Sequence, residues 1–504
     1  MRRLDSLPLI VVLMGLGAAM MLLPALHAYL HRAYPVARAF LYSAVMFAIL
    51  TVLIAIATAA RRRRENPRDQ LLTLFGAFTL LPAMLAVPFS EAIPDTTYFN
   101  AWWEMVSSFT TTGATLYDPE RLHPSLHLWR ALVAWFGGGF MLVAAVALLA
   151  PLNLGGFEVL RGTPAGFAAV SGPQMVGSTT LAERMVRHTL VILPVYAGLT
   201  LLLWTGLIIA GDRALVAACH AMSVLSTSGI TPLGGLDETG SGIRGEAVML
   251  PFFVFALSRN LYPSGHSVRR ETGLREDPEL RLALLLMIVV PSLLFLRHWF
   301  GALETDRIDN AEAALGALWG TVFTVLSFLT TTGFESFDWV EARNWSGLAS
   351  PGLILAGLAV IGGGVATTAG GVKLLRVIAL YRHGEREVER LIHPSSVGGA
   401  GAEARRLRRQ GAQMAWIFFM LFALSIAATM LAFALSGLDF EQSTIFAVAA
   451  LSTTGPLASV AATAPLSWAE LDSAARVIAI AAMVLGRLET LAIIALLNPE
   501  FWRG

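Results

Sequence analysis

The chain is poor in charge and in cysteine, and each shortage excludes a class of protein. Only 14% of its 504 residues are charged and 56% are hydrophobic, whereas soluble domains carry roughly 25% charged residues. With a mean hydropathy of +0.65, a water-soluble globule is excluded, because the apolar residues cannot all be hidden in cores. The single cysteine, Cys219, excludes an intramolecular disulfide. A net charge of +1 gives no field that would attract nucleic acid.

Long apolar runs predict an all-α membrane protein with ten transmembrane helices. A span needs about 20 apolar residues, and basic residues concentrate in the loops that this topology places on the side of the amino terminus. The positive-inside rule therefore predicts a plasma-membrane protein with a cytoplasmic amino terminus. The first run is too long for a signal peptide, so we expect it to be retained. The ten runs lie near 7–30, 36–60, 71–89, 128–150, 187–210, 246–262, 280–300, 350–380, 412–436 and 474–502.

Four shorter apolar segments lie between certain spans, near 100–112, 214–228, 312–332 and 440–454. Twelve helical residues cover only about 18 Å of a ~30 Å hydrocarbon core. We therefore expect four re-entrant pore helices that enter from outside. Backbone that turns back at that depth needs protein or water as hydrogen-bond partners, so these segments are expected to line a pathway.

Each short segment ends in three hydroxyl residues followed by a glycine, and we call the last three residues of each ending a glycine segment. A helix C-cap would explain one such ending, but four copies favour four repeats of span, pore helix, glycine segment and span. The predicted regions are a two-helix preamble at 1–65 and pore repeats at 66–155, 156–266, 267–395 and 396–504. Glycine segments 1 to 4 are Thr111, Thr112 and Gly113; Thr227, Ser228 and Gly229; Thr331, Thr332 and Gly333; and Thr453, Thr454 and Gly455.

The four glycine segments are suited to a dehydrated alkali cation. Rings of backbone carbonyls can replace the water shell of such an ion, and glycine reaches the dihedral angles that turn successive carbonyls toward one axis. Each pore helix precedes its glycine segment, so the partial negative charge of its carboxyl end would point at the ion path. The hydroxyl residues would add an oxygen ligand or support the segment from behind. The sequence therefore predicts a cation filter made of all four glycine segments.

These motifs make the chain resemble the Trk/Ktr/HKT superfamily of potassium uptake proteins, and the two-span preamble resembles its bacterial TrkH/TrkG branch. The stretches 361–373, 486–489 and 498–503 strengthen the resemblance. It implies K⁺ as the transported ion, no cofactor in this chain, a homodimer in membrane lipid, and a TrkA-like cytoplasmic nucleotide-binding regulatory subunit. A first filter glycine, here Gly113, goes with K⁺ preference in that family, whereas serine goes with Na⁺-permeable plant members. Ser228, Ile230 and Ala369 depart from the usual bacterial pattern.

A glycine-rich stretch interrupts the apolar run near 350–380. Each glycine costs a helix about 1 kcal/mol relative to alanine, so the stretch indicates either a close-packing face of small residues or a break that forms a loop across the pore. The resemblance implies that such a loop gates conduction. Lys373, the only lysine, lies in the pore vestibule or at the inner membrane interface. The candidate gate residues are Gly362, Gly363, Gly364, Thr367, Thr368, Gly370, Gly371, Lys373 and Arg487.

Arg487 falls within the last predicted span, where a charge must face protein or water. It either snorkels to the inner surface beside Glu489 or projects into the pore as a barrier to cations, as the resemblance implies. The Arg- and Glu-rich stretch 382–409 is either a solvated helix-loop or a docking surface. We expect potassium uptake, alternatively Na⁺-permeable or K⁺/Na⁺ or K⁺/H⁺ cotransport. A transporter of an organic solute would instead need paired or inverted repeats, and no constellation of an intramembrane enzyme is visible.

Overall fold

The computed structural model describes residues 8–58, 67–152, 154, 156, 181–262, 276–302, 311–346, 352–392, 402–462 and 464–489. Within these ranges the chain forms helices, turns and loops and no strand. The predicted all-α architecture is therefore confirmed for the described part of the chain. The glycine-rich stretch from 157 to 180 and the closing stretch 490–504 lie outside it.

The described helices occur in the following order along the chain. They are α1 (Leu9–Met20), α2 (Leu22–Leu30), α3 (Tyr34–Thr58), α4 (Pro67–Ala92), α5 (Tyr98–Phe109), α6 (Pro124–Ala144), α7 (Ala150–Leu152), α9 (Leu181–Ala210), α10 (Ala214–Ser226), α11 (Ile243–Phe253), α12 (Pro278–Ala302), α13 (Ala311–Leu329), α14 (Trp339–Ser346), α15 (Gly352–Ile361), α16 (Leu374–Ile392), α17 (Ala402–Leu435), α18 (Phe440–Leu451), α19 (Leu457–Ala461) and α20 (Ser473–Leu488). A π-helical turn, Ala145–Leu149, joins α6 to α7, and single 3₁₀ turns occur at Pro119–Arg121, Val254–Ala256, Arg259–Leu261 and Trp468–Glu470.

Seven helical stretches in the described ranges are long and apolar enough to cross a membrane. Six of them carry large apolar side chains that the fold leaves exposed, such as Ile56 and Leu424, which is what lipid contact requires, whereas Pro124–Leu152 is mostly buried within the protein. The seven stretches are Leu9–Leu30, Tyr34–Thr58, Asp69–Ala92, Pro124–Leu152, Glu183–Ala210, Pro278–Arg297 and Gly411–Leu435.

The other three predicted spans form shorter helices. In the run near 246–262, α11 contains Pro251 and ends at Phe253, where 3₁₀ turns follow. In the run near 350–380, α15 ends at Ile361 and α16 begins only at Leu374. The last run is helical to Leu488, and the rest of it lies outside the described residues. The count of ten spans therefore stays a prediction.

Two of the helices that precede the glycine segments, α5 and α18, begin with polar caps and are largely buried in the protein. The Thr97 hydroxyl accepts from the backbone N–H of Asn100 at the start of α5. Asp439 caps α18 in the same way through the N–H of Gln442. Such caps satisfy backbone donors that a helix leaves unpaired at its first turn. Most residues of α5 are buried, so this helix is shielded from lipid by its neighbours.

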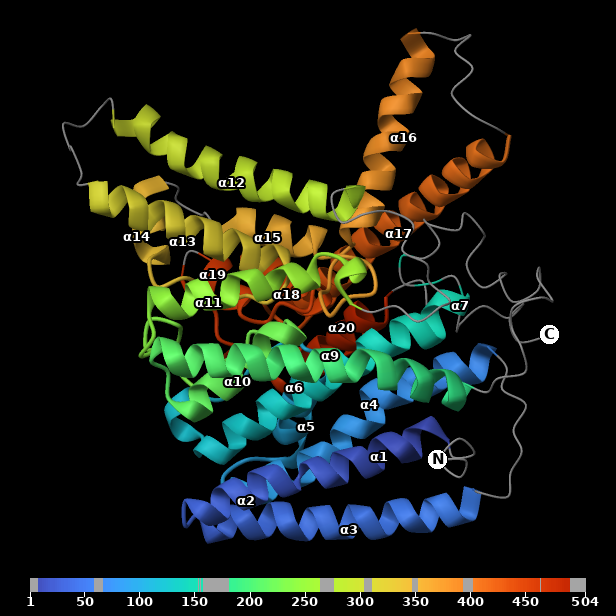
Figure 1. Ribbon diagram of the computed structural model, residues 1–504, viewed down its shortest axis with the longest axis vertical. Coiled ribbons are helices and arrows are strands. Elements are labelled where there is room, and N and C mark those ends of the chain that lie inside the picture. Colours follow the sequence, from blue (N-terminus) through green and yellow to red (C-terminus); the bar gives the residue numbers. More distant parts are fainter. Residues whose placement is uncertain are drawn as a thin grey trace.

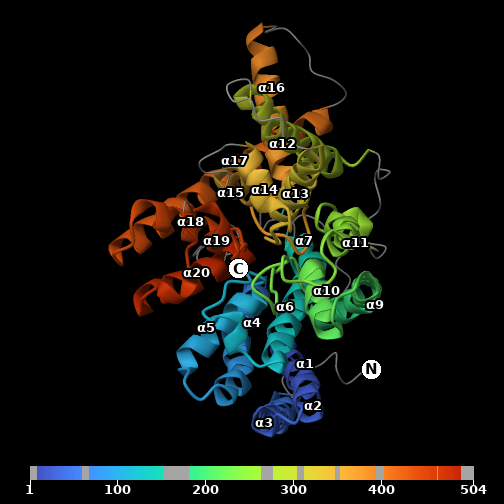
Figure 2. The ribbon, with the colours of Figure 1, turned by 90° about the vertical axis from the view of Figure 1, so that its left-hand side faces the viewer.

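The helices gather in four groups around a centre. Figure 2, which looks nearly along the helices, shows the groups α4–α6, α9–α11, α12–α15 and α17–α20 surrounding a common middle. Helices α1–α3 lie outside these groups; α1 and α3 pack on α4, and α2 packs on α6. Helix α16 projects away from the bundle (Figure 1). The glycine segments, which follow α5, α10, α13 and α18, are therefore brought from distant parts of the chain to the middle of the molecule.

Candidate functional site

The four glycine segments share an unusual backbone. Their first residues, Thr111, Thr227, Thr331 and Thr453, all have φ between 54° and 58°. A β-branched residue with positive φ is a steric outlier that persists only where the surroundings hold it. Gly113, Gly229 and Gly333 also have positive φ, from 64° to 86°. Gly455 does not, and the following Pro456 gives the reason, because a residue before proline is restricted to extended conformations.

Hydroxyl pairs support each glycine segment from its own helix end. The residue three before the glycine shares a hydrogen bond with the residue directly before it, and this contact occurs in all four copies. The pairs are Thr110–Thr112 at 2.8 Å, Ser226–Ser228 at 3.1 Å, Thr330–Thr332 at 3.0 Å and Ser452–Thr454 at 3.2 Å, measured between hydroxyl oxygens. The hydroxyl residues of each segment thus bond one another in all four copies, while their role at an ion stays a prediction.

The four glycine segments touch one another in a closed cycle. A Cβ atom added to Gly113 would lie 1.7 Å from the Ser228 carbonyl oxygen of segment 2, and one added to Gly229 would lie 2.2 Å from the Thr332 oxygen of segment 3. The remaining two contacts close the cycle. A Cβ at Gly333 would lie 3.2 Å from the Thr454 side chain, and one at Gly455 would lie 2.7 Å from the Thr112 oxygen.

The close approach explains why these positions are glycine. Any side chain at Gly113 or Gly229 would overlap a neighbouring backbone oxygen, so larger residues would push the segments apart. Between segments 4 and 1 the contact is also a hydrogen bond, in which the Gly455 N–H donates to the Thr112 oxygen at 2.6 Å. The glycine and hydroxyl residues of all four segments are buried, and they form one compact ring.

The predicted loop follows α15 and packs against two of the glycine-segment regions. The Gly370 N–H donates to the Thr331 hydroxyl at 2.8 Å, and the Thr368 hydroxyl donates to the Leu225 oxygen at 3.1 Å. The Thr367 hydroxyl donates to the Ala256 oxygen at 3.0 Å. The loop is buried, and Gly362 and Gly371 at its two ends have positive φ. Gly363, Gly364 and Gly370 each lie against backbone atoms that leave no space for a Cβ.

Two buried cations reach into this loop. Arg487 of α20 is 3% exposed, and its Nη1 donates to the Thr368 oxygen at 2.6 Å. Its Nε and Nη2 have no hydrogen-bond partner among the described residues. Lys373 is 6% exposed, and its Nζ donates to the Ala369 oxygen. Both positive charges therefore lie beside the loop, and neither side chain extends to a solvent-exposed surface.

Glu489 does not serve as the partner of Arg487. Its Oε2 instead pairs with Nη2 of Arg376 at 2.6 Å, with both side chains buried. The Arg376 guanidinium also lies 3.5 Å from the centre of the Phe418 ring, within the range of a cation–π contact. These contacts join α16, α17 and the end of α20 directly after the loop. No sequence pattern marks Arg376, because its ion-pair partner Glu489 is distant in the chain.

Another carboxylate holds the loop from a different side. The Glu279 Oε1 at the start of α12 accepts from the Val365 N–H at 2.8 Å. The Gly364 N–H donates to the Ala256 oxygen at 2.9 Å. The loop is thus fixed by backbone contacts to the region after α11, by Glu279 of α12 and by Arg487 of α20. No sequence motif marked Glu279, because one acidic residue at a helix start is most often a cap.

Comparisons with known proteins agree with one another. A family model described as the TrkH cation transport protein matches residues 247–502. The chain is 29% identical over 499 residues to the Trk system potassium uptake protein TrkH of Salmonella typhimurium, with 98% of each chain covered. It is 25% identical over 469 residues to TrkG of Escherichia coli, covering 91% of this chain and 92% of that one.

A solved structure has the same fold over the full length. The crystal structure of the potassium transporter TrkH from Vibrio parahaemolyticus superposes with a TM-score of 0.79 and covers 100% of both chains at 24% identity. At that identity the likeness establishes the fold alone. The curated TrkH of Vibrio parahaemolyticus is 29% identical over 509 residues, with 98% of each chain covered.

Proposed function

This chain belongs to the TrkH family of cation transport proteins, and from this membership we infer that it takes up potassium across the inner membrane of a bacterium. Its relatives over nearly the full length are named as Trk system potassium uptake proteins. K⁺ is the transported ion, and no enzyme activity or cofactor is part of this function. The apolar helices with exposed side chains agree with a multi-pass membrane protein.

We propose that the closed cycle of glycine segments is the selectivity filter. This cycle is the observation that carries the proposal, because a ring of backbone from four directions can surround one ion with carbonyl oxygens. Left-handed dihedrals at the first and third positions of segments 1 to 3 turn successive peptide groups in a way that ordinary strands do not. The carboxyl ends of α5, α10, α13 and α18 point at the ring and favour a cation there.

We further propose that the loop at 362–373 is the gate. It lies between the last turn of α15 and the first of α16, and it contacts glycine segment 3 directly. Arg487 adds a positive charge bound to the loop carbonyl of Thr368. A cation that passes the ring would meet this charge and the loop together. Opening would then require the loop to move and to release Arg487 and Lys373 from their carbonyl partners.

The proposed topology has ten spans and four re-entrant pore helices, with the amino terminus in the cytoplasm. Helices α5, α10 and α18 have 12, 13 and 12 residues, so each covers less than about 20 Å of a ~30 Å core. They end at the ring, and a second helix of the same group continues after each. We propose the preamble at 1–65, which contains α1–α3, and pore repeats at 66–155, 156–266, 267–395 and 396–504, each of which contains one of the four helix groups.

The proposed assembly is a homodimer in lipid with a TrkA-like nucleotide-binding subunit on the cytoplasmic side. Helix α16 leaves the bundle and carries exposed apolar and charged side chains, among them Tyr381 and Leu391. It begins directly after the proposed gate loop. Movement of a subunit bound to α16 would therefore be transmitted directly to the loop. No nucleic acid is expected as a partner.

Rubidium uptake by the purified protein in lipid vesicles tests the function. We expect ⁸⁶Rb⁺ to accumulate when vesicles are loaded with K⁺, and uptake to fall with added external K⁺ but not with amino acids or sugars. A protein that an organic solute inhibits competitively would belong to another transporter class. Current–voltage measurement under a pH gradient then separates the modes of transport. A reversal potential that follows K⁺ alone indicates a channel, and one that moves with pH indicates K⁺/H⁺ coupling.

A further inference from the structure

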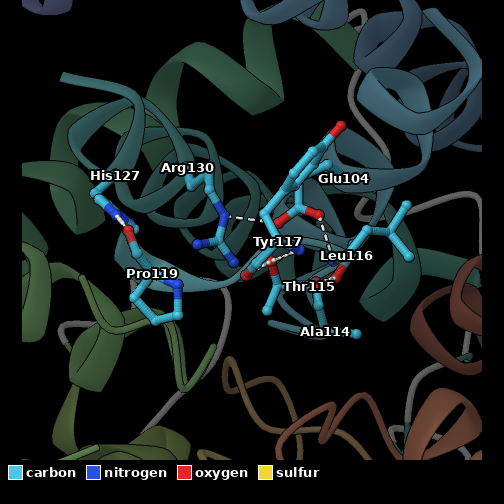
Figure 3. Close-up of polar contacts among 9 residues, drawn as sticks. Glu104, Ala114, Thr115, Leu116, Tyr117, Pro119, His127 and Arg130 are labelled. Carbon is cyan, nitrogen blue, oxygen red and sulfur yellow. Dashed lines mark hydrogen bonds and ion pairs between the residues drawn. The ribbon is translucent and has the colours of Figure 1, made fainter. Parts of the chain in front are cut away.

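The stretch of chain that follows each glycine segment is here called its outgoing strand, although it forms no β-strand, and that of segment 1 is held by a buried carboxylate. Figure 3 shows Glu104 of α5 between this strand and Arg130 of α6. The Glu104 Oε2 accepts from the Leu116 N–H at 3.0 Å, and its Oε1 lies 2.7 Å from Nε of Arg130. The two side chains are 0% and 4% exposed. A buried ion pair is costly to desolvate and adds little to stability by itself, so its retention calls for another explanation.

The position of Glu104 has a counterpart in every repeat. Glu104 stands nine residues before Gly113, and His220, Thr324 and Phe446 stand nine residues before the other three glycines. The first two of these counterparts also contact the outgoing strand. His220 Nε2 shares a hydrogen bond of 2.9 Å with the Thr231 hydroxyl, and the Thr324 hydroxyl accepts from the Ser336 N–H at 3.2 Å.

In the fourth repeat the contact passes through an aromatic pair. The Phe446 ring packs on Trp468 with ring centres 4.7 Å apart, and Trp468 Nε1 donates to the Gly455 oxygen at 3.0 Å. The position nine residues before the glycine therefore supports the outgoing strand in three copies, and in the fourth it supports the glycine itself through Trp468. The chemistry of the support differs between copies: a carboxylate, an imidazole, a hydroxyl and an aromatic pair.

A second carboxylate reinforces segment 3. Glu246 of α11 is 2% exposed, and its Oε1 accepts from the Phe337 N–H at 2.5 Å. Its Oε2 accepts from the Ser336 hydroxyl and from Trp319 Nε1, each at 2.7 Å. Helix α11 belongs to the group of segment 2, so these bonds tie neighbouring groups together. Segments 1 and 3 lie opposite each other in the cycle, and each has one buried carboxylate on its outgoing strand.

We propose that Glu104 and Glu246 are positioning residues that fix the width of the ring and so its preference for K⁺ over Na⁺. The proposal rests on the proposed function. The two ions differ in radius by a fraction of an ångström, so a ring distinguishes them only if its backbone cannot relax around the smaller ion. Hydrogen bonds to an ionised acceptor are about twice as strong as neutral ones, which suits them to hold a strand against such relaxation.

The decisive test compares two uncharged replacements of the same ion pair. Glu104→Leu with Arg130→Leu removes both charges and the acceptor, whereas Glu104→Gln with Arg130→Leu removes both charges but keeps an oxygen for the Leu116 N–H. The K⁺/Na⁺ permeability ratio is measured from reversal potentials in mixed salts. We expect the first variant to lower the ratio about tenfold and the second to stay within about threefold of the wild type. Glu246→Leu and Glu246→Gln form the equivalent pair for segment 3.

Asp212→Asn is the matched control. Asp212 is also buried, and its Oδ1 accepts from the Ser241 N–H at 3.0 Å, but it contacts no glycine segment. The midpoint of thermal unfolding in KCl and in NaCl gives a second measurement. A stabilising effect of K⁺ over Na⁺ that disappears in the leucine variants and persists in Asp212→Asn supports the proposal. Lower midpoints in both salts with an unchanged permeability ratio overturn it, since Glu104 and Glu246 would then be structural only.

Further outcomes separate this proposal from the function on which it rests. A wild-type protein that carries K⁺ and Na⁺ equally contradicts the selective filter and the proposal with it. A selective wild type with unchanged ratios in all four variants contradicts only the role of the two carboxylates. If a leucine variant does not reach the membrane, Glu104→Asp replaces it in the comparison. The shorter aspartate side chain is then expected to lower the K⁺/Na⁺ permeability ratio. A ratio equal to that of the wild type overturns the proposal.

Discussion

The hydroxyl of Thr331 accepts a hydrogen bond of 2.8 Å from the backbone N–H of Gly370, so glycine segment 3 and the loop after α15 are in direct contact. Thr331 has φ of 58°, and this bond is one of the contacts that hold it there. In the proposed mechanism the filter and the gate are then not independent, because a shift of the loop changes the partner of a filter residue.

Thr331→Val tests this contact. Valine keeps the β-branched shape but cannot accept from Gly370, so the loop loses one anchor and the closed state is weakened. Loss of a buried hydrogen bond of ~1 kcal/mol predicts that resting ⁸⁶Rb⁺ flux rises roughly fivefold. Thr331→Ser keeps the acceptor and is expected to leak less than Thr331→Val. Equal leaks from the two variants would show that the hydrogen bond does not restrain the loop.

Arg487→Ala is expected to leak cations at rest. The substitution removes a buried positive charge and the bond from Nη1 to the Thr368 oxygen, both of which oppose passage of K⁺ in the proposed closed state. Flux without any regulatory subunit should rise by roughly an order of magnitude, which corresponds to ~1.4 kcal/mol in the barrier. Vesicle flux assays measure this leak directly.

Arg476→Ala is the matched control for that change. Arg476 lies on the same helix, but its Nη1 donates to the Asn100 side chain at 2.8 Å and it has no contact with the loop. We expect its resting flux to match the wild type. If Arg476→Ala and Arg487→Ala leak to the same extent, loosening of α20 rather than the lost barrier charge explains the leak.

Much of this site could be predicted because it repeats. One hydroxyl-glycine ending is ambiguous, but four endings with the same spacing identify equivalent positions, and the glycines near 362–371 indicated where a helix stops. The positive φ of Thr111 and its counterparts could not be predicted, since a β-branched residue normally avoids it. At Thr331 the surroundings include the bond from Gly370, a residue distant in the chain that local sequence does not indicate.

The carboxylates were missed for a related reason. Glu104 pairs with Arg130, and Glu246 bonds Phe337 from another helix group, so neither pair lies at a helical spacing that a sequence pattern detects. A comparison of the four repeats at the position nine residues before each glycine could have indicated Glu104. It could not have indicated Glu246, because that residue supports a repeat other than its own. The last predicted span was also too long as a single helix, since α20 ends at Leu488.

Gly113→Ser is expected to admit Na⁺. The added Cβ would lie 1.7 Å from the Ser228 oxygen and would require φ of 72°, which serine adopts only with strain. Segments 1 and 2 must then separate, and the ring loses the fit that distinguishes the two ions. A reversal potential that moves toward the Na⁺ equilibrium value in mixed salts is the expected result. Gly198→Ser is the control, because a Cβ there meets nothing within 4 Å, and an unaltered reversal potential in Gly113→Ser would contradict the prediction.

Uptake is expected to depend on external pH through Glu335, which follows Gly333 by two residues on the proposed outer side. Burial raises the pKa of its carboxyl to about 7, while Arg343 opposes the rise and Asp237 adds to it. The carboxyl is therefore neutral below about pH 7 and negative above it, and the negative form attracts K⁺ to the mouth of the ring. Uptake should rise about twofold as external pH increases through 7, the size expected for one partly screened charge.

Initial ⁸⁶Rb⁺ rates measured from pH 6 to 8 at fixed internal pH test this, and Glu335→Gln should flatten the profile. A wild-type pH profile in Glu335→Gln would assign the titration to another group.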